Sequence, residues 1–203
     1  MIAIKYFGEV DEATKEEKES VLKSCENAQE LWDNGVHSWL IWLVTQETVL
    51  TKKERLLFVC WCIRQVWAVL EDERSEQCVI IAEKYANGEA TEEELQLAKL
   101  NANIATREAF DVVYEAFKVD SKGHPIAINY EYYICATAIA RNAATILDDI
   151  NIIIHNVDRA LIAMNDSMMN FDNDYDVICD FKKKQMKYLR ENCTPNFERI
   201  THV

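Results

Sequence analysis

Residues 56–70 read LLFVCWCIRQVWAVL, and this stretch decides the fold class. Arg64 and Gln65 are its polar side chains, so a helix over this stretch is apolar on almost every side. Such a helix belongs in the interior of a helical protein, and the stretch is too short for a bilayer, which needs about 20 apolar residues in a row. Thr51 and Glu54 match a capping box, in which each side chain accepts a hydrogen bond from the backbone N–H of the other residue. We therefore predict a buried central helix that begins at this box.

The segment before this stretch shows the periodicity of amphipathic helices. Over residues 12–33, apolar side chains recur three and four positions apart, and charged side chains fill the opposite face. Gly35 follows, as is typical just beyond the end of a helix. The pattern predicts one helix over about 12–33 and a short second helix from about residue 36.

Capping residues mark the next helices along the chain. Asp72 or Ser75 is expected to cap a helix that Asn87-Gly88 ends, because glycine adopts the left-handed conformation at helix ends. Thr91 and Glu94 form a second capping box. It predicts a helix that extends to about residue 119.

The second half of the chain contains its clearest break, SKGHP at residues 121–125. Residues 128–169 are expected to form one long helix or two collinear helices, and residues 175–192 a last helix before a tail that begins at Pro195. One apolar stripe marks the face of the long segment that packs on a core. Its members are Ile146, Leu147, Ile150, Ile153, Ile154, Val157 and Leu161.

The composition agrees with these helices, since 4 Gly and 2 Pro in 203 residues are too few for the tight turns of an all-β fold. We predict an all-α fold, a single-domain bundle of about seven or eight helices over residues 1–203.

Segments 64–72 and 141–149 share an Arg, a Leu and two acids at the same offsets. Parts 1–120 and 126–203 are therefore either related half-bundles or a chance match between amphipathic helices.

The cysteines and the first residues indicate the compartment. Seven cysteines are an odd number and lack the spacing of a disulfide framework, so most are expected to act as small apolar side chains in a reducing cytosol. The first residues lack the basic flank and long apolar run of a secretory signal. We expect a cytoplasmic protein with no membrane span.

No metal and no cofactor are expected. Cys60 and Cys62 point about 200° apart on a helix, so their sulfurs cannot share one ion. The acidic segment 172–176 resembles the start of a calcium loop, but Val177 and Lys183 stand where that loop needs Gly and Glu. A solvated acidic turn is the favoured interpretation. The chain also lacks a phosphate-binding Gly-rich loop and a nucleophile motif.

One polar helix face is the candidate for a functional pocket. Asp148, Asn151, His155 and Asp158 share this face, which could do acid–base chemistry or bind a metal if another helix supplied partners. The face also lies opposite the apolar stripe, where a solvated surface belongs, and this second interpretation is favoured. The residues of the candidate pocket are Arg64, Arg141, Asp148, Asp149, His155 and Asp158.

The charge of the chain is strongly acidic and unevenly distributed. The net charge is −13, yet residues 181–203 contain six basic and two acidic residues, so the other 180 residues hold −17. An acidic surface repels phosphate backbones, which disfavours direct nucleic-acid binding. An acidic surface attracts a basic protein partner, either by its charge alone or by imitating a nucleic acid. The alternative is that the charge serves to keep the protein soluble.

Two tryptophans are candidates for contact with a partner. Five tryptophans fall within residues 32–67, and most are expected in the core because each buries a large apolar area. Trp39 and Trp42 lie on the short helix after Gly35, where they either join the core or anchor a partner.

From ERLLFVCWC at residues 54–62, the chain resembles a large set of uncharacterised bacterial and phage proteins. These proteins share a Leu- and Cys-rich helix followed by segments that appear here as DERS at 72–75, AEKYANG at 82–88 and ATEEEL at 90–95. The likeness is good over residues 51–100 and loose elsewhere. It implies a helical fold and one cooperative domain, and it implies no activity.

Two functions from different classes follow. The first is a non-enzymatic, acidic, helical interaction module, a regulator or inhibitor of a host protein encoded by a phage or mobile element. The alternative is a helical-bundle enzyme or metal-binding protein that uses the polar pocket around Arg64, Arg141, Asp148 and His155.

Overall fold

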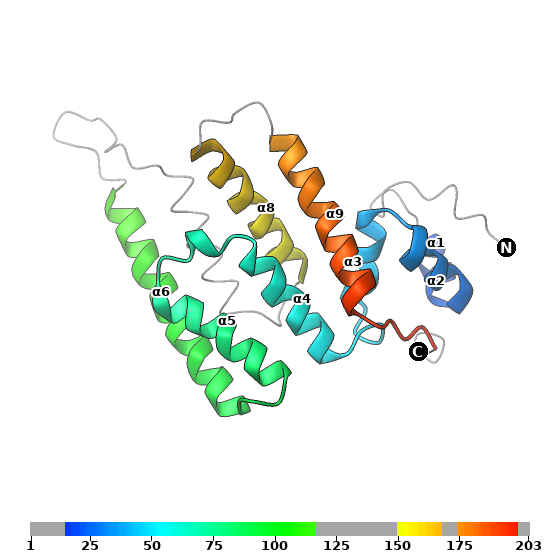
Figure 1. Ribbon diagram of the computed structural model, residues 1–203, viewed down its shortest axis with the longest axis horizontal. Helices are drawn as coiled ribbons and strands as arrows, with labels where there is room; N and C mark the ends of the chain where they lie inside the picture. The colour runs from blue at the N-terminus through cyan, green and yellow to red at the C-terminus, as the bar shows by residue number, and fades with distance from the viewer. Residues whose placement is uncertain (1–14, 117–149, 168–173, 199–203) are drawn as a thin grey trace. The chain divides into compact units, whose positions relative to one another are not determined.

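The computed structural model describes residues 15–116, 150–167 and 174–198. Within these ranges the chain forms eight α-helices, one 3-10 turn and no strand, so the predicted all-α fold is confirmed (Figure 1). The elements are α1 (Lys15–Leu22), α2 (Cys25–Asn34), α3 (His37–Thr45), α4 (Lys52–Arg64), η3 (Trp67–Val69), α5 (Glu73–Ala86), α6 (Glu92–Ala116), α8 (Ile150–Ser167) and α9 (Asp174–Asn192).

The chain divides into two compact units with boundaries inside α4 and α9. Unit 1 comprises Met1–Arg55 and Asp180–Val203, and unit 2 comprises Leu56–Cys179. These boundaries differ from the halves 1–120 and 126–203, because the C-terminal part of α9 bonds to α2 and α3. The loop at 121–125 and segment 141–149 lie outside the described residues.

In unit 1, the segment predicted as one helix over 12–33 is two helices. Ser24 interrupts it, because its hydroxyl accepts a hydrogen bond from the Asn27 N–H at 3.2 Å and caps the start of α2. Gly35 ends α2, and a Cβ there would lie 2.3 Å from the Leu31 carbonyl oxygen, so a larger residue does not fit. The apolar periodicity continues through this region without interruption, so it does not reveal that the Ser24 cap separates two helices.

The last carbonyls of α2 are bonded by α9. Arg190 donates from Nε to the Trp32 carbonyl at 2.8 Å and from Nη2 to the Gly35 carbonyl at 3.1 Å. Carbonyls at the end of a helix have no partner within it, so a cation there satisfies them and also suits the helix dipole. His37 Nε2 and the amide oxygen of the buried Gln185 lie 2.6 Å apart in a further bond between α3 and α9.

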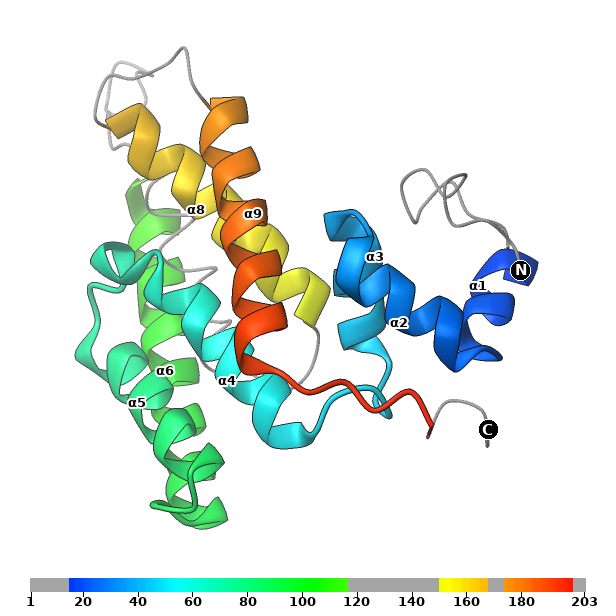
Figure 2. The same ribbon diagram turned by 45° about the vertical axis from the view of Figure 1, so that its right-hand side comes forward.

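In unit 2, α5 and α6 pack side by side (Figures 1 and 2). Asp72 caps α5 by accepting from the Arg74 N–H at 2.8 Å. Gly88 ends α5 with a φ of 77°, and the capping box of Thr91 and Glu94 opens α6. All three predicted boundaries are confirmed.

Most apolar side chains of the central stretch are buried, as predicted, but the stretch is not one helix. Leu56, Phe58 and Ile63 in α4 and Val66 beyond it are each at most 1% exposed. The helix ends at Arg64 because its last turn tightens: the next two N–H groups bond to carbonyls three residues back, and η3 follows. The predicted helix to residue 70 is therefore wrong, since a 3-10 turn keeps the same side chains buried and leaves the hydropathy pattern unchanged.

The described part of the predicted long helix is α8, where the apolar stripe is confirmed, while Ile146 and Leu147 of that stripe lie outside the described residues. Ile150, Ile153, Ile154 and Val157 are buried, and Leu161 is half-buried. The last helix, α9, matches the prediction within a residue at each end. Among the described residues, no helix is long and apolar enough to cross a membrane.

Candidate functional site

Arg64, the first member of the predicted polar pocket, is bonded to a residue that the pattern did not indicate. Its Nε and Nη2 donate to the two carboxylate oxygens of Glu83 in α5, each at 2.6 Å. The guanidinium also lies over the ring of Trp67, 4.5 Å from the centroid. This fork-to-fork ion pair links α4 to α5 and neutralises the charge of Arg64.

The other pocket candidates lie on α8 or outside the described residues. His155 is exposed and Asp158 is half-buried, whereas Arg141, Asp148 and Asp149 are not described. The described part of the face thus includes solvated positions, Asn151 and His155. Within the described ranges no group of three His, Cys, Asp or Glu side chains is placed to bind a metal. The polar pocket stays a prediction.

The two cysteines of α4 are core residues, as the favoured interpretation predicts. Cys60 is 1% exposed and Cys62 is fully buried, and both are thiols. Burial raises the pKa of Cys60 well above its ordinary value and raises the pKa of Cys78 to about 12. These thiols stay protonated at neutral pH and behave as apolar side chains.

Trp39 belongs to the core and not to a partner surface. Its side chain is 0% exposed, and its ring meets that of Trp42 edge to face, with centroids 5.3 Å apart. The alternative that made Trp39 a partner anchor is corrected by this burial, since a side chain with no exposed area cannot contact a partner. Trp42 is half-buried, and its role as an anchor stays a prediction.

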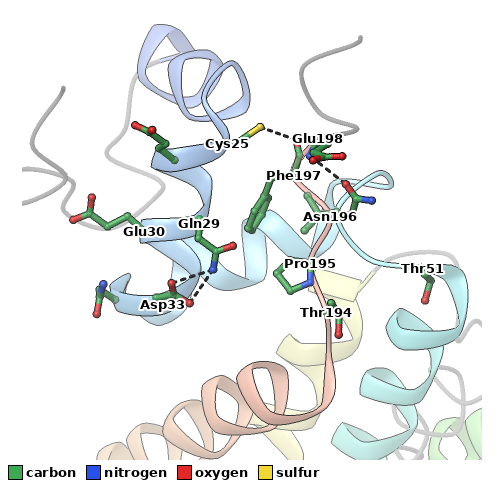
Figure 3. A pocket seen from close by; sticks show the side chains of 13 residues that line it. Cys25, Gln29, Glu30, Asp33, Thr51, Thr194, Pro195, Asn196, Phe197 and Glu198 are labelled. Atoms are coloured by element: carbon green, nitrogen blue, oxygen red, sulfur yellow. Dashed lines mark hydrogen bonds between the residues drawn. The ribbon is translucent and has the colours of Figure 1, made fainter.

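Unit 1 contains a groove that the sequence interpretation missed. Its walls are one face of α2, positions 49 and 51 in the loop before α4, and the tail at positions 194–198, and its volume is about 830 Å³ (Figure 3). We call it the acidic groove, because its described lining includes four carboxylates and no Lys or Arg. The four are Glu26, Glu30, Asp33 and Glu198.

Three hydrogen bonds hold the tail at 194–198 in place as one wall of the groove. The Thr194 N–H donates to Glu54 Oε1 at 2.7 Å, and the Asn196 N–H donates to the Val49 carbonyl at 2.8 Å. The Cys25 thiol lies 3.5 Å from the Phe197 carbonyl oxygen and donates to it. The groove is therefore built from residues at opposite ends of the chain.

Phe197 fastens the tail from its apolar side. The ring is 6% exposed and meets the ring of Trp32 edge to face, with centroids 6.4 Å apart. Figure 3 shows it between α2 and the tail. Buried aromatic pairs of this geometry contribute more than their area alone, so Phe197 is the main apolar anchor of this wall.

Glu54 connects the capping box to the tail. Its Oε2 accepts from the Thr51 hydroxyl and N–H, while its Oε1 accepts from Thr194. Burial alone would raise the pKa of Glu54, but these hydrogen bonds outweigh it and lower the pKa below its ordinary value. Glu54 is thus ionised at neutral pH, when it caps α4 and fastens the tail at once.

Unit 2 contains a smaller hollow of different character between α5 and α6. Its volume is about 340 Å³, and Ile81, Leu97 and Ala98 form its apolar part. Arg74 lies in its lining and is paired with Asp72 and Glu108, at 2.7 and 2.5 Å. Charges of both signs meet there, in contrast to the acidic groove.

One signal in the sequence could have located half of the groove. Glu26, Glu30 and Asp33 are four and three positions apart, so they share one face of α2. The other half could not be inferred, because the tail meets α2 through a contact across 172 residues. Local patterns say nothing about such a pairing.

The chain was compared with protein-family models, with curated proteins and with solved structures, and none of the three comparisons gave a match. The resemblance to the bacterial and phage set therefore stays a prediction, and the site rests on its own geometry.

Proposed function

We propose that this chain is an acidic, non-enzymatic protein-interaction module that binds a basic segment of a protein partner in the acidic groove. The single observation that supports this proposal is the lining of the groove, with four carboxylates around apolar side chains and no described cation. A concave surface with one sign of charge concentrates ligands of the opposite sign.

The physical chemistry of the groove favours a protein over a nucleic acid. Phosphate backbones are repelled by carboxylates, whereas Lys and Arg side chains are attracted to them. Glu26, Glu30, Asp33 and Glu198 are all exposed, so they can meet a cation without the cost of prior burial. A cytoplasmic regulator or inhibitor of a basic protein is the function that this chemistry supports best.

Affinity capture with two matched variants tests the proposal. The immobilised chain is used to capture its partner from a lysate at low and at high salt, beside Glu30→Lys and Glu89→Lys. Glu30 lines the groove, whereas Glu89 is an exposed acid in unit 2, so the two substitutions change the net charge equally.

The expected result is a captured basic protein that is lost with Glu30→Lys and at high salt, and kept with Glu89→Lys. Equal loss with both variants would mean that net charge alone holds the partner, and the groove would then not be the site. Capture of nothing at any salt concentration would contradict the proposal as a whole.

A further inference from the structure

We infer that the acidic groove recognises a short cationic segment in which one apolar side chain lies between Lys or Arg residues, and that this apolar side chain binds the floor of the groove. The inference rests on the proposed function and specifies the partner for that same site. It follows from the apolar floor of the groove, from the carboxylates at its two edges and from the spacing of the carboxylates on α2.

The floor of the groove is apolar and prebuilt. Its accessible apolar part is formed by the half-buried Cys25 from α2 and Pro195 from the tail, and the almost fully buried Val49 and Phe197 complete the apolar lining. Val49 and Phe197 are buried, so their positions are fixed by the core beneath them. An apolar group that fills a prebuilt depression supplies most of the affinity at an interface, whereas charges at a rim act mainly on association rate and specificity.

Carboxylates occupy both edges of this floor. In Figure 3, Glu30 extends to the α2 edge with its carboxylate directed away from Phe197, and Glu198 lies on the tail, beyond Phe197. A ligand that lies along the apolar floor therefore has carboxylates on both sides of it. Cations on both sides of an apolar residue satisfy that arrangement, and a single terminal cation does not.

The spacing of the carboxylates on α2 suits an extended segment. Glu26 and Glu30 are four positions apart on a helix, which is about 6 Å along its axis. Alternate residues of an extended chain are about 6.6 Å apart. Lysines at every second position of an extended ligand therefore match this edge closely.

Binding of synthetic peptides to the full chain tests the inference. The first peptide is fluorescein-labelled, alternates lysine with glycine and has one central leucine; the second replaces that leucine with serine and keeps every lysine. Fluorescence anisotropy measures both affinities for the unmodified chain, Glu30→Lys and Glu89→Lys at two salt concentrations.

We expect the leucine peptide to bind at least about tenfold more tightly than the serine peptide, which corresponds to about 1.4 kcal/mol. Both affinities should fall with salt and with Glu30→Lys, and both should persist in Glu89→Lys, because only Glu30 lines the groove. Sedimentation of the chain alone provides the remaining control, since α9 includes basic side chains that a second copy could offer.

The outcomes separate the inference from the proposed function. Equal affinities of the two peptides, both lowered by Glu30→Lys, would overturn the apolar anchor and leave the basic partner in place. Failure of both peptides, with a basic protein still captured through Glu30, would overturn the short segment alone. Reversible self-association abolished by Glu30→Lys would assign the groove to a second copy and overturn the inference.

Discussion

Unit 1 and unit 2 differ in the sequence distance that their bonds span. In unit 2, Arg64 bonds to Glu83 across 19 residues and Arg74 to Glu108 across 34. In unit 1, Cys25 bonds to Phe197 across 172 residues. These bonds of unit 2 join helices that are close in the sequence, whereas the bond of unit 1 joins residues near opposite ends of the chain.

The difference has a thermodynamic and a functional consequence. Contacts between distant residues form only after a long loop is closed, so they gain little from local structure that forms early. The acidic groove lies at such a contact, between α2 and the tail. Unit 2 pairs the partly exposed charges of Arg64 and Arg74 with carboxylates, and unit 1 exposes charges of one sign around a hollow.

The largest effect is expected for Phe58→Ala in unit 2. Phe58 is 0% exposed, so its removal leaves a cavity and should lower the free energy of unfolding by about 3–5 kcal/mol. Leu57→Ala, at a half-buried neighbouring position, is the matched control and should cost distinctly less. Urea unfolding followed by circular dichroism measures both, and equal costs would mean that α4 buries a different face.

Phe197→Ala should act on unit 1 in a local way. We expect the tail to detach without global unfolding, at a cost of about 2 kcal/mol that is seen as about 30-fold faster hydrogen exchange at the Thr194 and Asn196 amides. These amides bond to Glu54 and to the Val49 carbonyl. Exchange in α5 should stay unchanged; equal acceleration there would erase the contrast between the units.

A smaller effect is expected for the ion pair of unit 2. Arg64 is 40% exposed and Glu83 26%, so solvent screens their attraction. We expect a coupling energy of about 1 kcal/mol from a double-mutant cycle of Arg64→Ala and Glu83→Ala, raised above a plain surface pair by its two parallel hydrogen bonds. A coupling near zero would show that helix packing alone joins α4 to α5.

The smallest effect concerns pH and the tail. The pKa of Glu54 lies below its ordinary value of 4.5 in the folded chain, so its contribution is present above that value and is lost as pH falls through the lowered pKa. Hydrogen exchange at Thr194, corrected for the intrinsic pH dependence, should therefore become less protected in acid. Glu54→Gln should flatten this change, and Glu89→Gln should not alter it.

The local features of the fold could be predicted from the sequence because each depends on residues a few positions apart. The capping box of Thr91 and Glu94, the Asp72 cap and the left-handed Gly88 are of this kind. The end of α4 at Arg64 was missed, because hydropathy does not distinguish an α-helix from the 3-10 turn that follows it.

The candidate site could be predicted less well than the fold. Trp39 was a candidate surface anchor, and only the packing of unit 1 shows that it is buried. A guanidinium pairs well with a carboxylate, but only the pairing of the helices decides that the partner of Arg64 is Glu83. The acidic face of α2 becomes a groove only when the tail packs beside it, which no local pattern specifies.

The acidic groove is tested most directly by a nuclear magnetic resonance titration of the nitrogen-15-labelled full chain with the leucine peptide. Gln29 and Asn196 line the acidic groove, while Gln77 and Asn101 line the smaller hollow of unit 2, and each has a side-chain amide that can be followed. We predict saturable shifts at Gln29 and Asn196 and none at Gln77 and Asn101. Shifts confined to Gln77 and Asn101, with Gln29 and Asn196 unchanged at saturation, would contradict the account.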